Sequence, residues 1–464
     1  MDVLSPTADI ASSINSTPLP PVAPSPHPAP AATAAPISAA HACRSSESAP
    51  LAVPPEPATL LDSGLPRVEL ESLVLKILLQ RGACTGSVIS EVTCMPRTIV
   101  GEALDRLRNE LLLTIKASSG IQDYVFQLTD AGFTRAQQYA ARCNFVGPAP
   151  VVFEEYVASI HRQSLQRAPF SLKNLQRALA SMTLQNSLVS QIGQALNDGR
   201  GLFLYGAPGN GKTSIAERVC ASFGQCVWIP QVITIHGELM RIYDPSCHEA
   251  VKSPQLDAIK YDHRWVLIRR PTIVVGGELT LEYLETRFNT AAGIAEAPVQ
   301  LKSNCGTLVI DDFGRQRVSC TEILNRLIVP LEKHYDFLYL ASGRQIQVPF
   351  DELLVLSTNL EPKDLLDEAF LRRIPYKIEI GDPTETQFRD LVIHQASTLG
   401  FEIDSGAVEH LIEQHYRRAH RPYRFCHPRD LLRQVKNFCE VHGEPKRLTA
   451  DTFDLAVQNY FAGF

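Results

Sequence analysis

The stretch that decides the fold is Gly206-Ala207-Pro208-Gly209-Asn210-Gly211-Lys212-Thr213, which matches G-x-x-x-x-G-K-[ST] at every fixed position. A strand-like run precedes it at residues 201–205, and a helical run from Ser214 follows it. In this context the glycines let backbone N–H groups converge on a phosphate at the positive end of the helix. The predicted nucleotide-binding residues are Gly206, Ala207, Pro208, Gly209, Asn210, Gly211, Lys212, Thr213 and Ser214.

Two side chains at the end of this loop carry specific chemistry. Lys212 supplies a point charge to the β- and γ-phosphates, and the Thr213 hydroxyl is a Mg²⁺ ligand. Further along the chain, three aliphatic residues at 308–310 end in Asp311 and Asp312. A strand would place both acids at the carboxyl edge of the sheet, where Asp311 holds Mg²⁺ and Asp312 polarises water. The sequence therefore predicts ATP hydrolysis with ATP and Mg²⁺ as cofactors.

Later motifs, taken with this loop and acid pair, resemble the AAA+ ATPase family in their order. Another strand-like run ends in Asn359, similar to sensor 1, which implies a hydrogen bond to the attacking water or the γ-phosphate. Residues 367–374 are similar to the segment with the arginine finger, so Arg372 or Arg373 is expected to enter the neighbouring subunit's site. Arg429 matches sensor 2 and is expected to reach the nucleotide.

The second acid of the pair departs from the family pattern. AAA+ proteins usually have Glu at this position, and Asp312 is one methylene shorter. The shorter reach could require a bridging water or a small shift of the strand. Slower hydrolysis is therefore one expectation.

Three further stretches are similar to the branch of MoxR-like ATPases and bacterial enhancer-binding activators or to a related group. Residues 287–294 resemble a helix-2 insert loop that projects toward substrate, with a simple surface loop as the alternative. Residues 337–348 predict a compact hairpin before Asn359. Residues 312–316 resemble a bacterial group of predicted ATPases with chaperone-type labels, some linked to Flp pilus assembly.

The region before the nucleotide-binding part has two different compositions. Residues 1–62 are rich in Pro, Ala and Ser and are predicted to be a disordered tether. Residues 63–146 show three helical segments and then two strand-like segments, which resembles a winged helix-turn-helix domain.

The third predicted helix of that domain would face DNA in a winged-helix protein. Its charges cancel, because three arginines are matched by three acids; these residues are Arg97, Arg106, Arg108, Glu102, Asp105 and Glu110. A DNA reader presents a surplus of cations to phosphates. Contact with a protein, or a structural role, is therefore favoured over DNA binding.

The predicted fold class is α/β: a P-loop AAA+ three-layer sandwich with a C-terminal helical lid, preceded by the winged helix-turn-helix domain. The predicted units are the tail (1–62), the winged-helix-like domain (63–146), a linker and helical lead-in (147–200), the nucleotide-binding domain (201–382) and the lid (383–464).

Composition limits the class of protein. Hydrophobic residues make up 45% and charged residues 20%, a globular balance, and no apolar run is long enough for a membrane helix. Asp2, Pro6 and Asp9 argue against a secretion signal. The eleven cysteines form no metal-binding spacing. We therefore expect a cytoplasmic chain without membrane insertion, and its net charge of -6 gives no general attraction to nucleic acid.

The resemblance implies a homo-oligomeric ring, expected to be a hexamer, that uses ATP to remodel an unidentified protein partner in a chaperone-like way. One alternative is an ATP-dependent DNA-binding regulator that acts through the winged helix. The other is a nucleotide-switched scaffold with weak turnover.

Overall fold

The computed structural model describes residues 53–120, 123–167, 170–224, 226–252, 259–365 and 368–462, so most of the predicted tail lies outside the described residues. Residues 53–62, also assigned to the tail, are packed instead. Leu60 is buried, and the Pro54 carbonyl accepts a hydrogen bond from the Asp262 backbone N–H at 3.0 Å. The predicted boundary at residue 62 is therefore wrong, because composition does not reveal long-range contacts.

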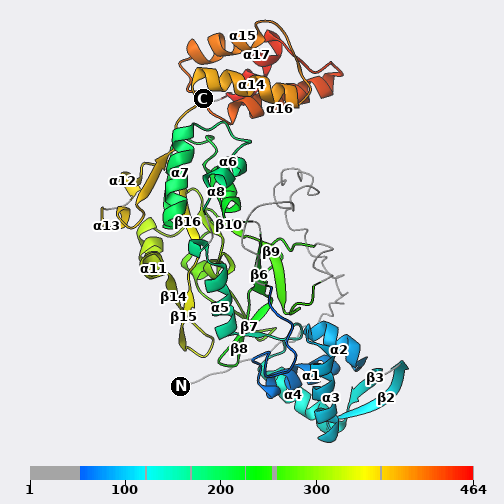
Figure 1. The fold of residues 1–464 in the computed structure, drawn as a ribbon. Helices are drawn as coiled ribbons and strands as arrows, with labels where there is room; N and C mark the ends of the chain where they lie inside the picture. The colour runs from blue at the N-terminus through cyan, green and yellow to red at the C-terminus, as the bar shows by residue number, and fades with distance from the viewer. Residues whose placement is uncertain are drawn as a thin grey trace, which may run out of the picture. The chain divides into compact units, whose positions relative to one another are not determined.

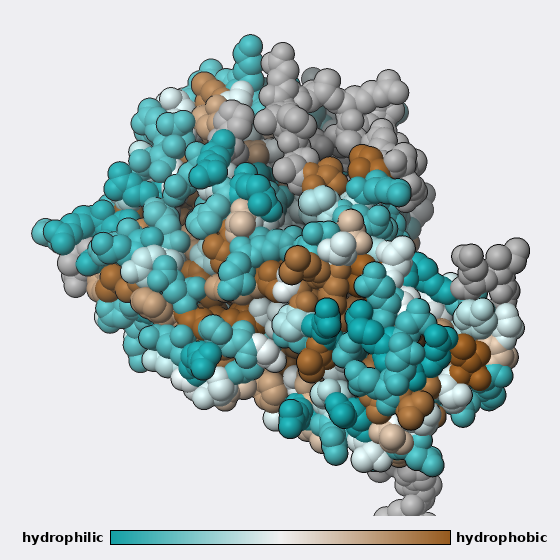
Figure 2. All heavy atoms as spheres, turned by 60° about the horizontal axis from the view of Figure 1, so that its bottom comes forward, coloured by the Kyte–Doolittle hydropathy of each residue, from teal (hydrophilic) through white to brown (hydrophobic). Residues whose placement is uncertain are grey.

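None of the helices in the described part of the chain combines the length and apolar character that a membrane crossing requires. On the face drawn in Figure 2, hydrophobic residues gather in several groups among hydrophilic ones. Such a mixture is ordinary for a folded protein surface.

The N-terminal domain has the order of elements predicted from the sequence, with two additions (Figure 1). The buried stripe of its third helix contains Val100 and Leu104, as expected. A short strand, β1, joins the predicted hairpin in a three-stranded sheet of order β1-β3-β2, and a further helix, α4, follows. The elements are α1 (Arg67–Arg81), β1 (Ala83–Thr85), α2 (Gly86–Thr93), α3 (Arg97–Asn109), β2 (Leu113–Gly120), β3 (Asp123–Leu128) and α4 (Asp130–Arg142).

The arginines of α3 are paired with acids of their own domain. Arg97 forms an ion pair with Asp123 of the hairpin. Arg106 pairs with Glu71 of α1 at 3.1 Å, and Arg108 pairs with the acid three residues before it at 3.2 Å. These pairs neutralise the cations that a DNA-binding helix would direct at phosphates.

A second sheet of five strands has the order β11-β12-β8-β7-β4. Its strands are β4 (Val151–Val152), β7 (Val232–Ile235), β8 (Glu238–Arg241), β11 (Arg287–Asn289) and β12 (Ile294–Glu296). The stretch 287–294, predicted to be a projecting insert loop, is instead an antiparallel hairpin. Ile294 of its returning strand is fully buried in the core of the N-terminal domain. The prediction missed this because it considered the stretch without its tertiary partners.

The α/β part is built on a parallel sheet of order β10-β13-β16-β5-β17. Along β5, Phe203 packs into one core and Leu204 into another. Helices α7 and α8 belong to the core with Leu204, and α11 belongs to the core with Phe203. Helices thus cover both faces, and the predicted α/β fold class is confirmed. The elements are β5 (Leu202–Tyr205), β10 (Thr272–Val275), β13 (Thr307–Ile310), β16 (Leu353–Thr358), β17 (Tyr376–Glu379), α7 (Asn186–Asp198), α8 (Lys212–Val219) and α11 (Cys320–Lys333).

Other strands around this sheet form pairs. The hairpin predicted over residues 337–348 is present as β14 (Tyr335–Tyr339) and β15 (Gln345–Pro349), which are antiparallel. Strands β6 (Cys226–Pro230) and β9 (Trp265–Arg269) also pair antiparallel, with α5 (Phe153–Gln163) beside β6.

The C-terminal region is mainly helical, as predicted, with a small pair of parallel strands in addition. Its core contains Phe388, Leu411, Tyr416, Leu431 and Phe453. One segment, η5, is a π-helix that continues directly from α15. The elements are α14 (Glu385–Thr398), β18 (Glu402–Ile403), α15 (Ala407–Ile412), η5 (Glu413–Arg417), α16 (His427–His442), β19 (Arg447–Leu448) and α17 (Ala450–Tyr460).

His427, the first residue of α16, makes this region sensitive to acid. Burial, together with the nearby Arg424 and Arg421, lowers the pKa of His427 to about 4. The unfolded chain binds a proton near the ordinary value of about 6.5, so this contribution to folding stability is complete above that pH and is lost as the pH falls from about 6.5 to about 4. The expected total loss is about 3 kcal/mol.

Hydrogen exchange of the α16 amides, corrected for intrinsic rates, measures this loss as a fall in opening free energy between pH 7 and pH 4.5. The matched variant His427→Asn cannot titrate and should lose less. An equal loss in both chains would assign the acid sensitivity to other groups.

Candidate functional site

The glycine-rich loop connects β5 to α8 with a backbone that only glycine can follow. Gly206, Gly209 and Gly211 have φ values of 133°, 82° and 84°, which lie in the left-handed region. A Cβ on Gly206 would lie 2.5 Å from the Ile380 carbonyl oxygen, and one on Gly209 would lie 2.4 Å from Cys426 Sγ. Both the turn and its close neighbours therefore require glycine.

A cavity of about 640 Å³ opens beside this loop. It lies at the carboxyl ends of β5, β13 and β16, the usual place for a ligand in a parallel α/β sheet. Its volume suits a ligand of nucleotide size. Of the predicted site residues, Pro208, Gly209, Asn210, Gly211, Lys212, Thr213, Ser214, Asp311, Asp312, Asn359 and Arg429 line it.

Lys212 is held at the base of the cavity, with 6% of its surface exposed. Its Nζ donates to the carbonyl oxygens of Gly206 and Ala207 at 2.9 and 3.0 Å and to Asn359 Oδ1 at 2.6 Å. Burial lowers the pKa of Lys212, and the nearby Arg424 adds to this effect. The negative charges of Asp311 and Asp312 oppose this shift only in part, and a bound phosphate would add further negative charge beside the buried ammonium group.

The two acids face different partners. Thr213 Oγ1 donates to Asp311 Oδ2 at 2.8 Å. Asn359 Nδ2 donates to Asp312 Oδ1 at 3.1 Å, so the Asn359 amide connects Lys212 to Asp312. The hydroxyl of Thr213 and the carboxylate of Asp311 offer hard oxygen donors, and these fit Mg²⁺.

Asp312 has a φ of 47°, in the left-handed region. Among residues with a Cβ, Asp and Asn tolerate this conformation best, because their short polar side chains can bond locally. The backbone at this position thus gives a physical reason for Asp where AAA+ proteins usually have Glu. Gln316 supports the turn, since its Nε2 donates to the carbonyl oxygens of Asp311 and Asp312 at 2.9 and 3.2 Å.

Asn210 connects the loop to the C-terminal region. It is almost fully buried, and its Nδ2 donates to Asp382 Oδ1 at 2.7 Å. Its Oδ1 accepts from the Phe425 backbone N–H at 3.4 Å, and the Cys426 N–H donates to the Gly209 carbonyl at 3.0 Å. These hydrogen bonds would therefore transmit a movement of the loop to the start of α16.

The predicted arginines lie in three different settings. Arg429 lines the cavity, is largely exposed and pairs with Asp430 at 3.0 Å. Arg373 donates to Glu332 at 2.7 Å. Arg372 is exposed, and its side chain makes no hydrogen bond or ion pair with the described residues. Neither Arg372 nor Arg373 lines the cavity of its own chain.

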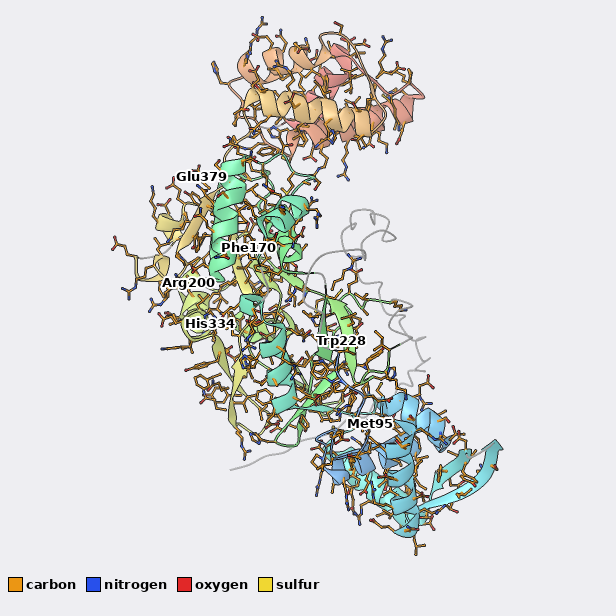
Figure 3. The ribbon with its side chains drawn as sticks, in the orientation of Figure 1. Met95, Phe170, Arg200, Trp228, His334 and Glu379 are labelled. Carbon is orange, nitrogen blue, oxygen red and sulfur yellow. The ribbon has the colours of Figure 1, made fainter. Side chains whose placement is uncertain are left out.

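Sequence reasoning missed much of the cavity wall. The segment 181–184, assigned only to a helical lead-in, lines it, as do Arg218, Arg315, Leu391, Gln395, Phe425 and Cys426. These residues have no motif of their own that could have indicated the cavity. A neighbouring hollow of about 520 Å³ shares Thr183, Leu184 and Phe425 with it and extends to Glu379, labelled in Figure 3.

Another cavity, of about 400 Å³, lies near the amino ends of β5 and β16. Phe170, Arg200 and His334 contribute to its wall (Figure 3). The amino edge of a parallel sheet is not where such folds bind ligands. The cavity beside the loop is therefore the better candidate for the functional site.

Comparison with known proteins gives a family match for part of the chain only. The family described as a domain of unknown function, DUF8689, matches residues 384–459. No curated protein sequence matches the chain.

Solved structures give distant likenesses. A mutant of RuvB from Thermotoga maritima is 14% identical, with 65% of this chain and 73% of that chain covered and a TM-score of 0.35. NtrX from Brucella abortus is 13% identical, with 62% and 58% covered and a TM-score of 0.39. A Thermotoga maritima RuvB structure described as a Holliday junction branch migration motor is 15% identical, with 64% and 72% covered and a TM-score of 0.32. At these values, none of them establishes what this chain does.

Proposed function

We propose that this chain is an AAA+ type ATPase that binds Mg²⁺ and ATP in the cavity beside the glycine-rich loop and hydrolyses the nucleotide there. The observation that carries the proposal is the meeting of Lys212, Thr213, Asp311, Asp312 and Asn359 at one cavity. They come from three separate segments of the chain, and each has the chemistry that phosphoryl transfer requires.

Each side chain has a defined task in this proposal. Lys212 binds the β- and γ-phosphates, while Thr213 and Asp311 hold Mg²⁺. Bound Mg²⁺ would neutralise charge on the phosphate oxygens. Asp312 accepts a proton from the attacking water, and Asn359 orients that water or the γ-phosphate. With nucleotide bound, Lys212 Nζ would exchange its bond to Asn359 Oδ1 for one to the phosphates, and Asn359 Nδ2, which now donates to Asp312, would be the donor available to the γ-phosphate or the water.

The resemblance to AAA+ proteins further supports a ring, with a hexamer as the expected form, in which one subunit completes the site of the next. Arg372 is the better candidate for the finger, because Arg373 is engaged by Glu332 of its own chain. An exposed guanidinium that is free to reach a neighbour can stabilise charge on the γ-phosphate.

The variant Arg372→Ala should therefore bind ATP normally and hydrolyse it about a hundredfold more slowly, because one donor to the developing charge is lost. Arg373→Ala is the matched comparison and should keep turnover close to that of the unaltered chain. Steady-state phosphate release measures both.

Mixing Arg372→Ala chains with Lys212→Ala chains tests whether the arginine acts between subunits. Lys212→Ala alone should be inactive and Arg372→Ala alone about a hundredfold slow, but a Lys212→Ala chain can provide its Arg372 to a neighbour with an intact loop. Recovery of turnover on mixing is expected. Inactive mixed oligomers, or full activity of Arg372→Ala alone, would contradict this role for Arg372.

We further propose that the energy is used to remodel a protein partner recruited by the N-terminal domain, in a chaperone-like way. The ion pairs that neutralise the arginines of α3 support a protein over DNA as the partner. Duplex binding by the full chain that weakens steeply with salt would favour the DNA-binding alternative. A chain that binds ATP but shows negligible turnover as an oligomer would favour the scaffold alternative.

A further inference from the structure

Two histidines and an aspartate converge in the C-terminal region, away from the nucleotide cavity. His410 lies on α15, His415 on the π-helix η5, and Asp454 on α17. The Nε2 atoms of His410 and His415 lie 2.8 and 2.5 Å from the same oxygen, Asp454 Oδ1. One ligand atom from each of the three residues can be chosen so that all lie within 4.8 Å of one another.

The π-helix is what brings the two imidazoles to the same side. In an α-helix of about 3.6 residues per turn, residues five apart are rotated by roughly 140° and cannot both face one carboxylate. The helix changes to i to i+5 bonding at Glu413, so His410 lies in the α-helical part and His415 in the π-helical part. The Arg418 N–H donates to the Glu413 carbonyl at 3.1 Å. Single π-helical turns are rare and occur frequently at functional sites.

We propose that His410, His415 and Asp454 form a binding site for a divalent first-row transition metal ion such as Zn²⁺. Two imidazole nitrogens and one carboxylate oxygen are a donor set that such ions prefer, whereas Mg²⁺ and Ca²⁺ prefer oxygen donors alone. Three protein ligands leave a coordination position for water or for a group from another molecule.

The geometry requires only a small adjustment to receive the ion. Zinc bonds of about 2.1 Å in a tetrahedron separate neighbouring ligand atoms by about 3.4 Å. Asp454 Oδ1 would therefore move away from the Nε2 atoms of His410 and His415, now at 2.8 and 2.5 Å, by roughly 0.6 and 0.9 Å. The side chains of His410, His415 and Asp454 are 29%, 22% and 48% exposed, so solvent can deliver the ion.

A metal ion here would link α15 and η5 to α17. Because the ion would bind the folded region and not the unfolded one, it would stabilise these helices against local opening. None of the three residues lines the nucleotide cavity, so the site does not depend on the proposed ATPase activity. Hydrogen bonding alone is the competing explanation for the cluster, and a binding experiment separates the two.

The experiment titrates the untagged full-length chain with Co²⁺ and then displaces it with Zn²⁺. We expect saturable binding of one ion per chain, a visible Co²⁺ spectrum without thiolate bands, and slower hydrogen exchange in α17 once Zn²⁺ is bound. His415→Ala and Asp454→Asn should weaken binding by at least about a hundredfold. His394→Ala, which removes an exposed histidine of α14, is the matched control and should bind as the unaltered chain does.

Circular dichroism of each variant shows whether the region still folds. If the alanine variant does not fold, Asp454→Asn still tests the site, because asparagine has nearly the size of aspartate. Equal Co²⁺ affinity of the folded Asp454→Asn and unaltered chains would overturn the proposal. Absence of saturable binding to the unaltered chain would also overturn it, as would a thiolate spectrum, which would assign the ion to cysteines.

Discussion

Lys212→Ala removes ATP binding and lowers turnover by about a thousandfold or more, because no other side chain can take the place of its ammonium group in the loop. Its Nζ is fixed by two loop carbonyls and Asn359, so the charge is positioned before nucleotide arrives. Burial already lowers the pKa of this group, and a bound phosphate would relieve that penalty. Nucleotide affinity and phosphate release measure the two losses separately.

Lys173→Ala is the matched control for this variant, since it removes an exposed lysine of the helical lead-in, away from the cavity wall. It should bind and hydrolyse ATP as the unaltered chain does. If both Lys212→Ala and Lys173→Ala hydrolysed ATP at the rate of the unaltered chain, the cavity beside the loop would not be the site of hydrolysis.

The sequence was sufficient for the parts of the site that depend on local backbone chemistry. The loop could be predicted because its glycines specify a turn between a strand and a helix, and Gly206 and Gly209 do have positive φ. Asp311 and Asn359 could be placed beside it because both follow buried strands, and parallel strands bring their carboxyl ends to one edge.

Features that arise from tertiary contacts could not be predicted in the same way. Thr183 and Gln395 line the cavity, but neither belongs to a recognisable pattern. Ile294 looked like part of a surface loop until the core that buries it was known. His410 and His415 have a spacing that an ordinary helix would separate, and nothing in the sequence indicated the change to a π-helix at Glu413, which places His415 on a different helical geometry from His410.

Asp312→Asn should keep ATP bound and lower its hydrolysis by about a thousandfold, because an amide cannot accept a proton from water. Asparagine tolerates the left-handed φ of 47° as well as aspartate does, so the turn should remain intact. Its side-chain oxygen can still accept from Asn359 Nδ2, which leaves the rest of the site in place. Nucleotide affinity and single-turnover hydrolysis measure the two effects, and unchanged hydrolysis would remove Asp312 from the proposed mechanism.

Asp312→Glu distinguishes the two explanations for the short acid. If reach limits the reaction, the extra methylene should speed hydrolysis, as expected from the Glu that AAA+ proteins usually have at this position. The left-handed backbone favours the opposite result, because Glu there carries a strain of about 1 kcal/mol that Asp largely avoids. We therefore expect Asp312→Glu to be no faster than the unaltered chain and less stable. A faster variant would mean that this turn accommodates glutamate easily and that the short side chain of Asp312 limits the rate of hydrolysis.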